Sequence, residues 1–257
     1  MTIVVAVTFG VLIGALLGLL GGGGSILAVP ALVYGVGLDM RQAIPVSLLV
    51  VGIASAVGAV PKIRAGQIQW RLAGIFAALG IPATFVGALV GARLPQAALL
   101  IGFSVVMIAA GIRMLSGSAS TGAACEIREG VIDWKRCASR SIPAALLVGL
   151  LTGLFGVGGG FLIIPALVLM LGVDMPIAVG TSLLIIVANS AAGVLSHLGA
   201  LSADCIVAAC FASTATVAAL VAAHIGTGLN TDRLRRWFAY LVFAVAAFVL
   251  IDTVWFG

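Results

Sequence analysis

The same glycine-rich segment occurs twice in this chain, about half the protein apart, and both copies lie in stretches that are almost entirely apolar. The first copy reads GLLGGGGSILAVPALV over Gly18–Val33, and the second reads GLFGVGGGFLIIPALV over Gly153–Val168. The two copies align without gaps, and the same residue occurs at 20 of 42 positions when Gly18–Ala59 is compared with Gly153–Val194. The constant separation between equivalent residues in this alignment is called the repeat offset. Matched glycine interruptions in two hydrophobic halves are typical of a transporter whose binding site lies at those interruptions.

The composition of the chain places all of it in a membrane. It is 63% hydrophobic and only 8% charged, whereas a soluble domain carries about 25% charged residues. The net charge of +5 comes from basic residues scattered among loops, so we expect no nucleic-acid partner. The four cysteines have no metal-ligand spacing, and although Cys125 and Cys137 could pair, we expect reduced thiols. We therefore expect no metal and no cofactor.

Eight segments are candidate membrane spans, since a span needs about 20 mainly apolar residues. They are Thr2–Leu20, Ala43–Val60, Leu72–Gly91, Ala97–Leu115, Ile142–Phe155, Ile177–Ser196, Ala203–Ile225 and Leu234–Val254. Two shorter pieces, Ser25–Val36 and Phe161–Leu171, follow the glycine clusters and are too short to cross comfortably at about 1.5 Å per residue. The sequence predicts an all-α polytopic membrane protein with about eight full transmembrane helices and two short, glycine-initiated half-helices.

The positions of Lys and Arg predict how the two halves are oriented, because these residues are enriched in cytoplasmic loops. If each glycine segment enters the membrane and returns, 11 basic residues lie on one side and 2 on the other. If the first helix of each half crosses and the short piece does not, the repeats are parallel and the split is 8 to 5. The first arrangement is favoured. It predicts two inverted repeats over 1–116 and 142–257, a cytoplasmic linker over 117–141, and both termini outside.

The glycine clusters predict an anion site. Glycine adopts backbone conformations that other residues avoid, and a half-helix that begins there presents free N–H groups and the positive end of its dipole. Hydroxyl and amide groups that follow in each half complete the predicted cage. The predicted substrate-binding residues are Gly22, Gly23, Gly24, Ser25, Ser47, Gly158, Gly159, Gly160, Thr181, Ser182 and Asn189. Two alternatives stay open: the glycines serve helix packing, and the hydroxyls bond back to their own helices.

The predicted spans lack central charged residues, which bears on coupling and direction. Asp39 and Asp174 are interpreted as helix N-caps, and no span carries an acidic or basic residue at its centre. The sequence therefore gives no strong sign of proton or sodium coupling. An anion that leaves a negative cytoplasm gains about 2.3 kcal/mol per charge for each 100 mV, so the physics favours export.

The repeated motif also carries a family likeness. The doubled pattern G-x-G-G-G-x-L-x-x-P-x-L, clear over Gly156–Leu167 and readable over Gly21–Leu32, resembles the TauE/SafE-type sulfite exporter family. The likeness covers nearly the whole chain. It implies a multi-pass permease of the bacterial-type inner membrane for sulfite, organosulfonates or related sulfur oxyanions. Val46 stands where the second copy has Thr181, so the predicted site is asymmetric.

We predict a non-enzymatic carrier that moves a small anion by alternating access, with the anion and membrane lipid as its partners. A passive anion channel and a permease for a different small organic anion are the alternatives. An intramembrane enzyme is not favoured, because the chain has neither GxSxG nor HExxH and only two histidines. The oligomeric state is open, with a homodimer as one option.

Replacing Gly159 tests the glycine site. Because a side chain there forbids the backbone conformations available to glycine, Gly159→Val is expected to abolish transport while the protein still inserts. Flux into proteoliposomes and recovery in the membrane fraction measure the two properties. Normal binding and transport by this variant would show that the glycine site is wrong.

Overall fold

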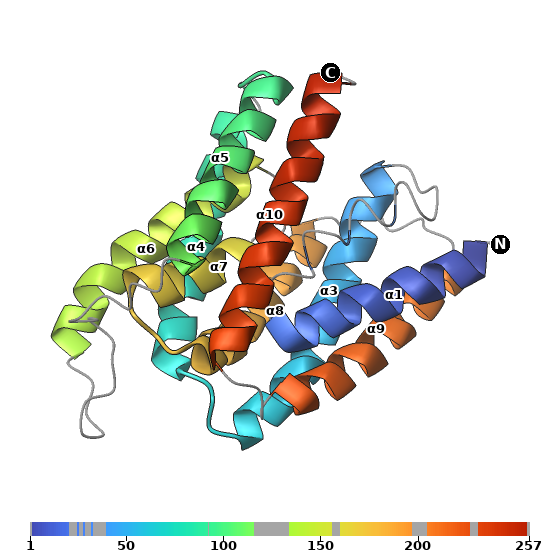
Figure 1. The fold of residues 1–257 in the computed structure, drawn as a ribbon, viewed down its shortest axis with the longest axis horizontal. Helices are drawn as coiled ribbons and strands as arrows, with labels where there is room; N and C mark the ends of the chain where they lie inside the picture. The colour runs from blue at the N-terminus through green and yellow to red at the C-terminus, as the bar shows by residue number, and fades with distance from the viewer. Residues whose placement is uncertain are drawn as a thin grey trace. The chain divides into compact units, whose positions relative to one another are not determined.

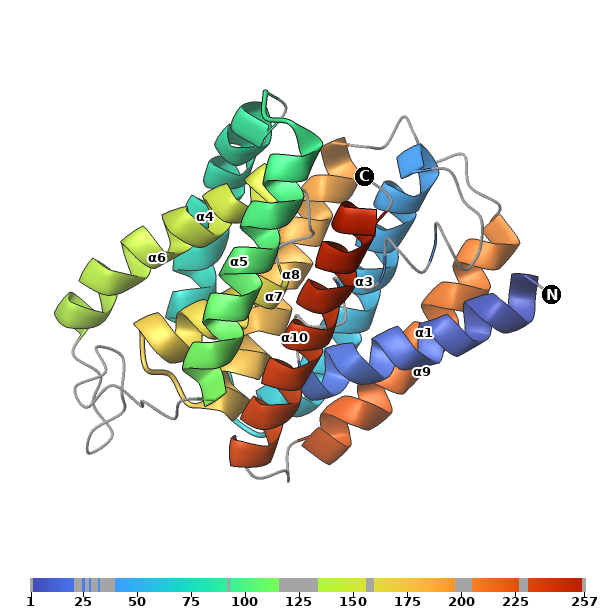
Figure 2. The same ribbon diagram turned by 45° about the horizontal axis from the view of Figure 1, so that its top comes forward.

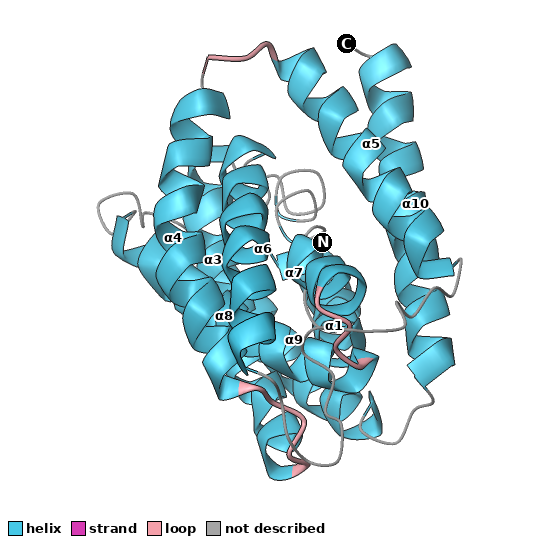
Figure 3. Ribbon diagram, turned by 90° about the vertical axis from the view of Figure 1, so that its left-hand side faces the viewer, coloured by secondary structure: helices cyan, strands magenta, loops and turns pink. Residues whose placement is uncertain are grey.

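The described part of the structure, a computed structural model, is almost entirely helical. The structure describes residues 2–20, 25, 28, 32, 40–91, 93–115, 134–155, 160–196, 205–226 and 231–255, and within these ranges it contains no strand (Figures 1 and 3). The helices are α1 (Thr2–Leu20), α3 (Met40–Arg64), α4 (Trp70–Gly91), α5 (Gln96–Leu115), α6 (Trp134–Phe155), α7 (Gly160–Pro165), η3 (Ala166–Met170), α8 (Met175–Ser196), α9 (Cys205–Gly226) and α10 (Thr231–Trp255). The predicted all-α class is confirmed for this part of the chain.

The helix boundaries recur at the same repeat offset as the sequence. Helices α4 and α9 begin at residues 70 and 205 and end at residues 91 and 226. Helices α3 and α8 begin at residues 40 and 175, and α5 and α10 begin at residues 96 and 231. Helices α1 and α6 end at residues 20 and 155. The repeat therefore extends, as a pattern of helix boundaries, well beyond the positions where the residues themselves match.

The short apolar piece after the second glycine cluster is helical, as expected. It begins as the α-helix α7 and continues as the single π-helical turn η3. The chain then turns at Gly172, whose φ is +68°, and the N–H of Val173 donates to the carbonyl of Leu167 at 3.0 Å. In the equivalent piece of the first half, residues 25, 28 and 32 are described and are also helical. The two glycine clusters, 21–24 and 156–159, lie outside the described residues.

The chain is an integral, multi-pass membrane protein. In the described part, four helices are long and apolar enough to cross a bilayer: Val46–Arg64, Trp70–Gly91, Cys137–Leu154 and Met175–Val194. Many large apolar side chains are exposed in addition to those in the core, with Leu89 70% exposed, Val217 63% and Phe248 60%. Such a surface is stable in contact with lipid, because the bilayer interior is as apolar as these side chains.

Contacts between residues divide the chain into two compact units. The first unit comprises residues 1–73, 158–164 and 176–229, and therefore contains α1, α3, α9 and nearly all of α8. The second unit comprises residues 74–157, 165–175 and 230–257, and therefore contains α5, α6, η3, α10 and most of α4. Each unit takes helices from both predicted repeats.

In the first unit, α1 lies along α9, and α3 packs against α9 as well (Figures 1 and 2). Glycines on α1 permit this close approach. A Cβ atom added to Gly14 would collide with the backbone of Ala215, and one added to Gly18 would collide with the carbonyl of Ala219. The contacts advance together along both helices, so α1 and α9 run parallel. Small residues of this kind allow helix backbones to approach closely in membranes.

In the second unit, α4 packs against α6 in an equivalent way. A Cβ atom on Gly149 would collide with the carbonyl of Gly80, and these two residues are the repeat equivalents of Gly14 and Ala215 respectively. Elsewhere in this unit, α5 lies beside α10, where the ring of Phe243 covers Gly111. The contact between α1 and α9 in the first unit thus recurs between α6 and α4 in the second.

Helix α6 also corrects one expectation about the cysteines. Cys137 is disulfide-bonded, so the prediction of a reduced thiol is wrong for this residue. Cys210, on α9, is free. Spacing along the chain says little about which cysteines meet, because pairing depends on the distance between their Cα atoms in the fold.

The α1–α9 contact can be tested with a single methyl group. Gly14→Ala is expected to lower the thermal stability of the purified protein, because overpacking of this kind costs about 1–3 kcal/mol. Gly74→Ala is the matched control, since its added methyl has no heavy atom within 4 Å. Thermal unfolding in detergent measures both. Equal unfolding temperatures for the two variants would contradict the close contact.

Candidate functional site

The first unit joins α3 and α8, the helices that occupy equivalent places in the two halves. A Cβ atom on Gly193 would lie 2.8 Å from Cδ1 of Leu48, and one on Gly58 would lie 3.9 Å from Cδ1 of Leu183. Leu48 and Leu183 are separated by the repeat offset, as are Gly58 and Gly193. The two contacts are therefore equivalent, and their order along the chain shows that α3 and α8 run antiparallel.

Equivalent hydroxyls lie on these two helices and are buried. Ser47 and Ser55 on α3 correspond to Ser182 and Ser190 on α8, and all four side chains are at most 4% exposed. Ser190 packs against Gly52 of α3, because a Cβ atom added to Gly52 would lie 2.9 Å from Cβ of Ser190. The hydroxyl groups therefore lie along a contact between helices and not on the lipid-facing surface.

A left-handed glycine ends α3 and directs the chain toward α8. Gly66 has φ +67°. The N–H of Gln67 donates to the carbonyl of Lys62 at 2.9 Å, and the N–H of Gly66 donates to the carbonyl of Ile63 at 3.0 Å. This pair of hydrogen bonds is a Schellman motif, which reverses the chain after a helix. It determines where residues 67–69 lie.

The turn that follows α3 contacts the start of α8. The N–H of Gln69 donates to Oγ1 of Thr181 at 3.1 Å in a buried hydrogen bond. A Cβ atom on Gly180 would collide with the carbonyl of Gln67, so only glycine fits there. Thr181, predicted as an anion ligand, therefore accepts a hydrogen bond from the protein, and a threonine hydroxyl can donate as well as accept.

Several buried polar atoms of the first unit have no hydrogen-bond partner among the described residues. They are Ser55 Oγ, Lys62 Nζ, Gln67 Oε1, Gln69 Oε1 and Asn189 Oδ1. All lie on α3, on the turn that follows it, or on α8. An unsatisfied buried polar group costs about 1–3 kcal/mol, and such groups in a native structure call for a specific explanation. These residues come from α3, the turn after it and α8, so this part of the first unit is a candidate site for a polar ligand.

The structure describes only some of the predicted site residues. Gly22, Gly23, Gly24, Gly158 and Gly159 lie outside the described residues, and Gly160 is the first residue of α7. Ser25, Ser47 and Thr181 are buried in the first unit, and Asn189 is half-buried there.

Ser182 fits the alternative in which a membrane hydroxyl bonds back to its own helix. Its Oγ donates to the carbonyl of Val179 on the same helix at 2.8 Å. A serine that bonds back to its own helix is common in membrane proteins. This bond uses its donor, and its oxygen can still accept a hydrogen bond.

Lys62, Gln67 and Gln69 were missed by sequence reasoning. Lys62 follows the predicted span Ala43–Val60, so the sequence predicts a loop there, but Lys62 lies in the last turn of α3 and its side chain is 0% exposed. A signal was present, because His197 occupies the equivalent position in the second half and gives both halves an ionisable side chain there. The two glutamines carry no such signal, since their role depends on the turn at Gly66.

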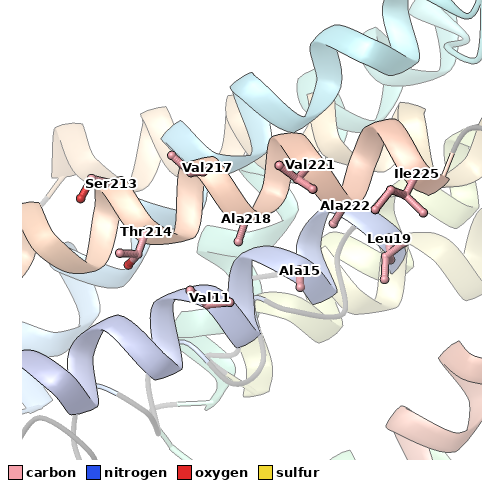
Figure 4. A pocket seen from close by; sticks show the side chains of 10 residues that line it. All are labelled: Val11, Ala15, Leu19, Ser213, Thr214, Val217, Ala218, Val221, Ala222 and Ile225. Carbon is pink, nitrogen blue, oxygen red and sulfur yellow. The ribbon is translucent and has the colours of Figure 1, made fainter.

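The groove between α1 and α9 is a poor alternative site. It has a volume of about 590 Å³ and is lined by apolar side chains together with Ser213 and Thr214 (Figure 4). Both hydroxyls donate to the carbonyl of Cys210 on their own helix, at 3.1 and 2.8 Å. With its donors used and no charge on its walls, this groove suits an acyl chain better than an anion.

Comparison with known proteins identifies relatives across the whole chain. The family model described as "Sulfite exporter TauE/SafE" matches residues 6–249. A "probable membrane transporter protein" of Xylella fastidiosa (strain Temecula1) is 34% identical over 256 residues, which is 97% of this chain and 95% of the relative. The "probable membrane transporter protein YunE" of Bacillus subtilis (strain 168) is 28% identical over 216 residues, which is 77% of this chain and 79% of the relative. No solved structure matches the chain.

The hydrogen bond at Thr181 can be tested by two substitutions. Thr181→Val keeps the shape of the side chain but removes the acceptor for the Gln69 N–H, so we expect a loss of about 1–3 kcal/mol in stability. Thr181→Ser keeps the hydroxyl and is expected to retain most of that stability. Thermal unfolding of the purified variants measures the difference. If the valine variant is as stable as the serine variant, the hydrogen bond does not hold the turn against α8.

Proposed function

This chain belongs to the sulfite exporter TauE/SafE family of membrane transporters, and on that premise we propose that it exports a small sulfur oxyanion by alternating access. The substrate class is sulfite or an organosulfonate. The observation that carries the proposal is the buried contact between α3 and α8, where equivalent serines are enclosed and Ser55 Oγ has no hydrogen-bond partner among the described residues. A serine hydroxyl can donate to an oxyanion oxygen, whereas the amide oxygens of Gln67, Gln69 and Asn189 are acceptors that suit the O–H of a protonated oxyanion.

The architecture in this proposal is two inverted repeats with eight full transmembrane helices and two half-helices. The antiparallel course of α3 and α8 supports it, because equivalent helices run in opposite directions in inverted repeats. The uneven distribution of Lys and Arg supports the same arrangement. Both termini then lie outside, and the linker between the halves lies in the cytoplasm.

The anion in this proposal is held between the two glycine clusters and the polar faces of α3 and α8. Backbone N–H groups around Gly22–Gly24 and Gly158–Gly160 would donate to it, as would the hydroxyl of Thr181 and the amide of Asn189. Helix N-termini bind anions through free N–H groups and the helix dipole. Neutral donors of this kind limit the number of charges that the membrane interior must accommodate.

Alternating access follows from two antiparallel copies of one structural unit. In inverted-repeat transporters, the two halves exchange conformations around a central site, so the site opens to one side and then to the other. The membrane potential sets the direction. Each negative charge that leaves the cytoplasm gains about 2.3 kcal/mol per 100 mV, and a dianion gains about twice that amount.

Flux measurements in proteoliposomes test this function. Labelled sulfite and sulfoacetate are offered with and without an imposed potential, and with and without unlabelled substrate on the far side. We expect saturable flux that far-side substrate stimulates and that a negative interior drives outward. Liposomes with Gly159→Val protein serve as the matched control.

The same measurement distinguishes the alternatives. Very high flux that far-side substrate does not stimulate would indicate a passive anion channel and would overturn alternating access. No flux of either compound through folded protein would overturn the sulfur-oxyanion substrate, and a panel of small organic anions would then identify a different permease.

A further inference from the structure

We propose that Lys62 supplies the positive charge that binds the transported anion. This inference rests on the proposed function, because it takes the ligand of Lys62 to be the transported anion. It adds a charged group to a site that was predicted from neutral donors alone. Its basis is a lysine side chain that is 0% exposed and whose Nζ has no hydrogen-bond partner among the described residues.

The Lys62 ammonium lies between the last turns of α1 and α9. It is 3.5 Å from the position that a Cβ atom on Gly226 would occupy, and the carbonyl oxygen of Gly18 and Cδ2 of Leu19 are 3.7 and 3.6 Å from that same point. Gly226 has no side chain to fill this space. Helix α1 ends at Leu20 and leads directly into the first glycine cluster. Lys62 therefore lies beside the helix end that the first glycine cluster follows in the sequence.

Ser55 and Lys62 share one face of α3. They are seven residues apart, which places them two turns apart on the same side of the helix. Both are buried, and neither Ser55 Oγ nor Lys62 Nζ has a partner in the described part of the chain. Gly58 lies between them on this face and adds no side chain. The buried face of α3 thus carries two donor groups about 10 Å apart along the helix axis, and the ammonium is the one that offers a full charge to an oxyanion.

A purely structural role for Lys62 is the alternative. The C-terminal ends of α1, α3 and α9 each carry about half a negative charge, which favours a nearby cation. However, a buried ammonium costs several kcal/mol unless its hydrogen-bond donors are also satisfied, and Nζ has no such bond among the described residues. An oxyanion offers both a full charge and several acceptor atoms. This combination favours a ligand over the helix ends alone.

Arg64 provides a matched control on the same helix end. Its side chain is exposed, and it lines an open groove of about 630 Å³ with Pro61 of α3 and with Leu220 and His224 of α9. Removing its charge changes the net charge of the helix end by the same amount as removing the charge of Lys62. It leaves the buried side chain of Lys62 beside Gly226 unchanged.

The experiment compares Lys62→Met, Lys62→Arg and Arg64→Gln. Methionine has a similar length and is apolar, so it leaves no unpaired polar group, and apolar replacements of buried charges are often neutral for stability. For each variant, the KM for sulfite is measured in counterflow, and thermal unfolding is measured with sulfite, sulfoacetate, sulfate or chloride at constant ionic strength. We expect Lys62→Met to raise KM about tenfold or more, since a hydrogen bond to a charged group typically contributes at least that factor. Lys62→Arg should keep anion binding in part, and Arg64→Gln should behave like the unmodified protein.

The outcomes separate this inference from the proposed function. If the unmodified protein transports sulfite and Lys62→Met does so with the same KM and the same anion stabilisation, the Lys62 inference is overturned and the function stands. If another anion stabilises the unmodified protein but not Lys62→Met, the inference stands and the sulfur-oxyanion substrate fails. If Lys62→Met does not fold while Lys62→Arg folds and binds no anion, the charge serves the structure alone, which overturns the inference.

Discussion

Close contact between helices that carry glycine at the contact points is the constraint on which the rest of this structure depends. Lipid offers no hydrophobic gain for burying apolar side chains, so helices in a membrane associate through tight packing and hydrogen bonds. Gly14 brings α1 against α9, and Gly149 brings α6 against α4. A close approach of the same kind between α3 and α8 buries hydroxyl groups that would cost much more in contact with lipid.

The α3–α8 contact converts this packing into a candidate binding site. Because α3 and α8 are equivalent and antiparallel, one glycine–leucine contact occurs twice along the pair. Serines at equivalent places are brought to the same buried region. The turn at Gly66 then adds the backbone of Gln69 to the start of α8. A contact that occurs twice between α3 and α8 thus brings polar groups from distant parts of the chain close together.

Much of the fold could be predicted from the sequence, because its signals are local. Helix lengths follow from apolar runs, and the helix after Gly160 follows from the glycine cluster before it. The positions that needed spatial information were predicted less well. Lys62 was placed in a loop, because the sequence near it contains further basic residues and does not reveal where α3 ends. The prediction that Cys137 is reduced was wrong because disulfide pairing depends on distances across the fold.

By itself, the sequence determined that this chain spans a membrane, that it is built twice at a constant offset, and that it belongs to the sulfite exporter TauE/SafE family. These properties follow from composition and from repeated motifs, which depend on residues near one another along the chain. The tertiary structure alone decided that α3 meets α8 antiparallel, that Thr181 binds the turn after α3, and that Lys62 is enclosed beside Gly226. Each of these depends on the close approach of helices far apart in sequence, and that approach is governed by packing in three dimensions.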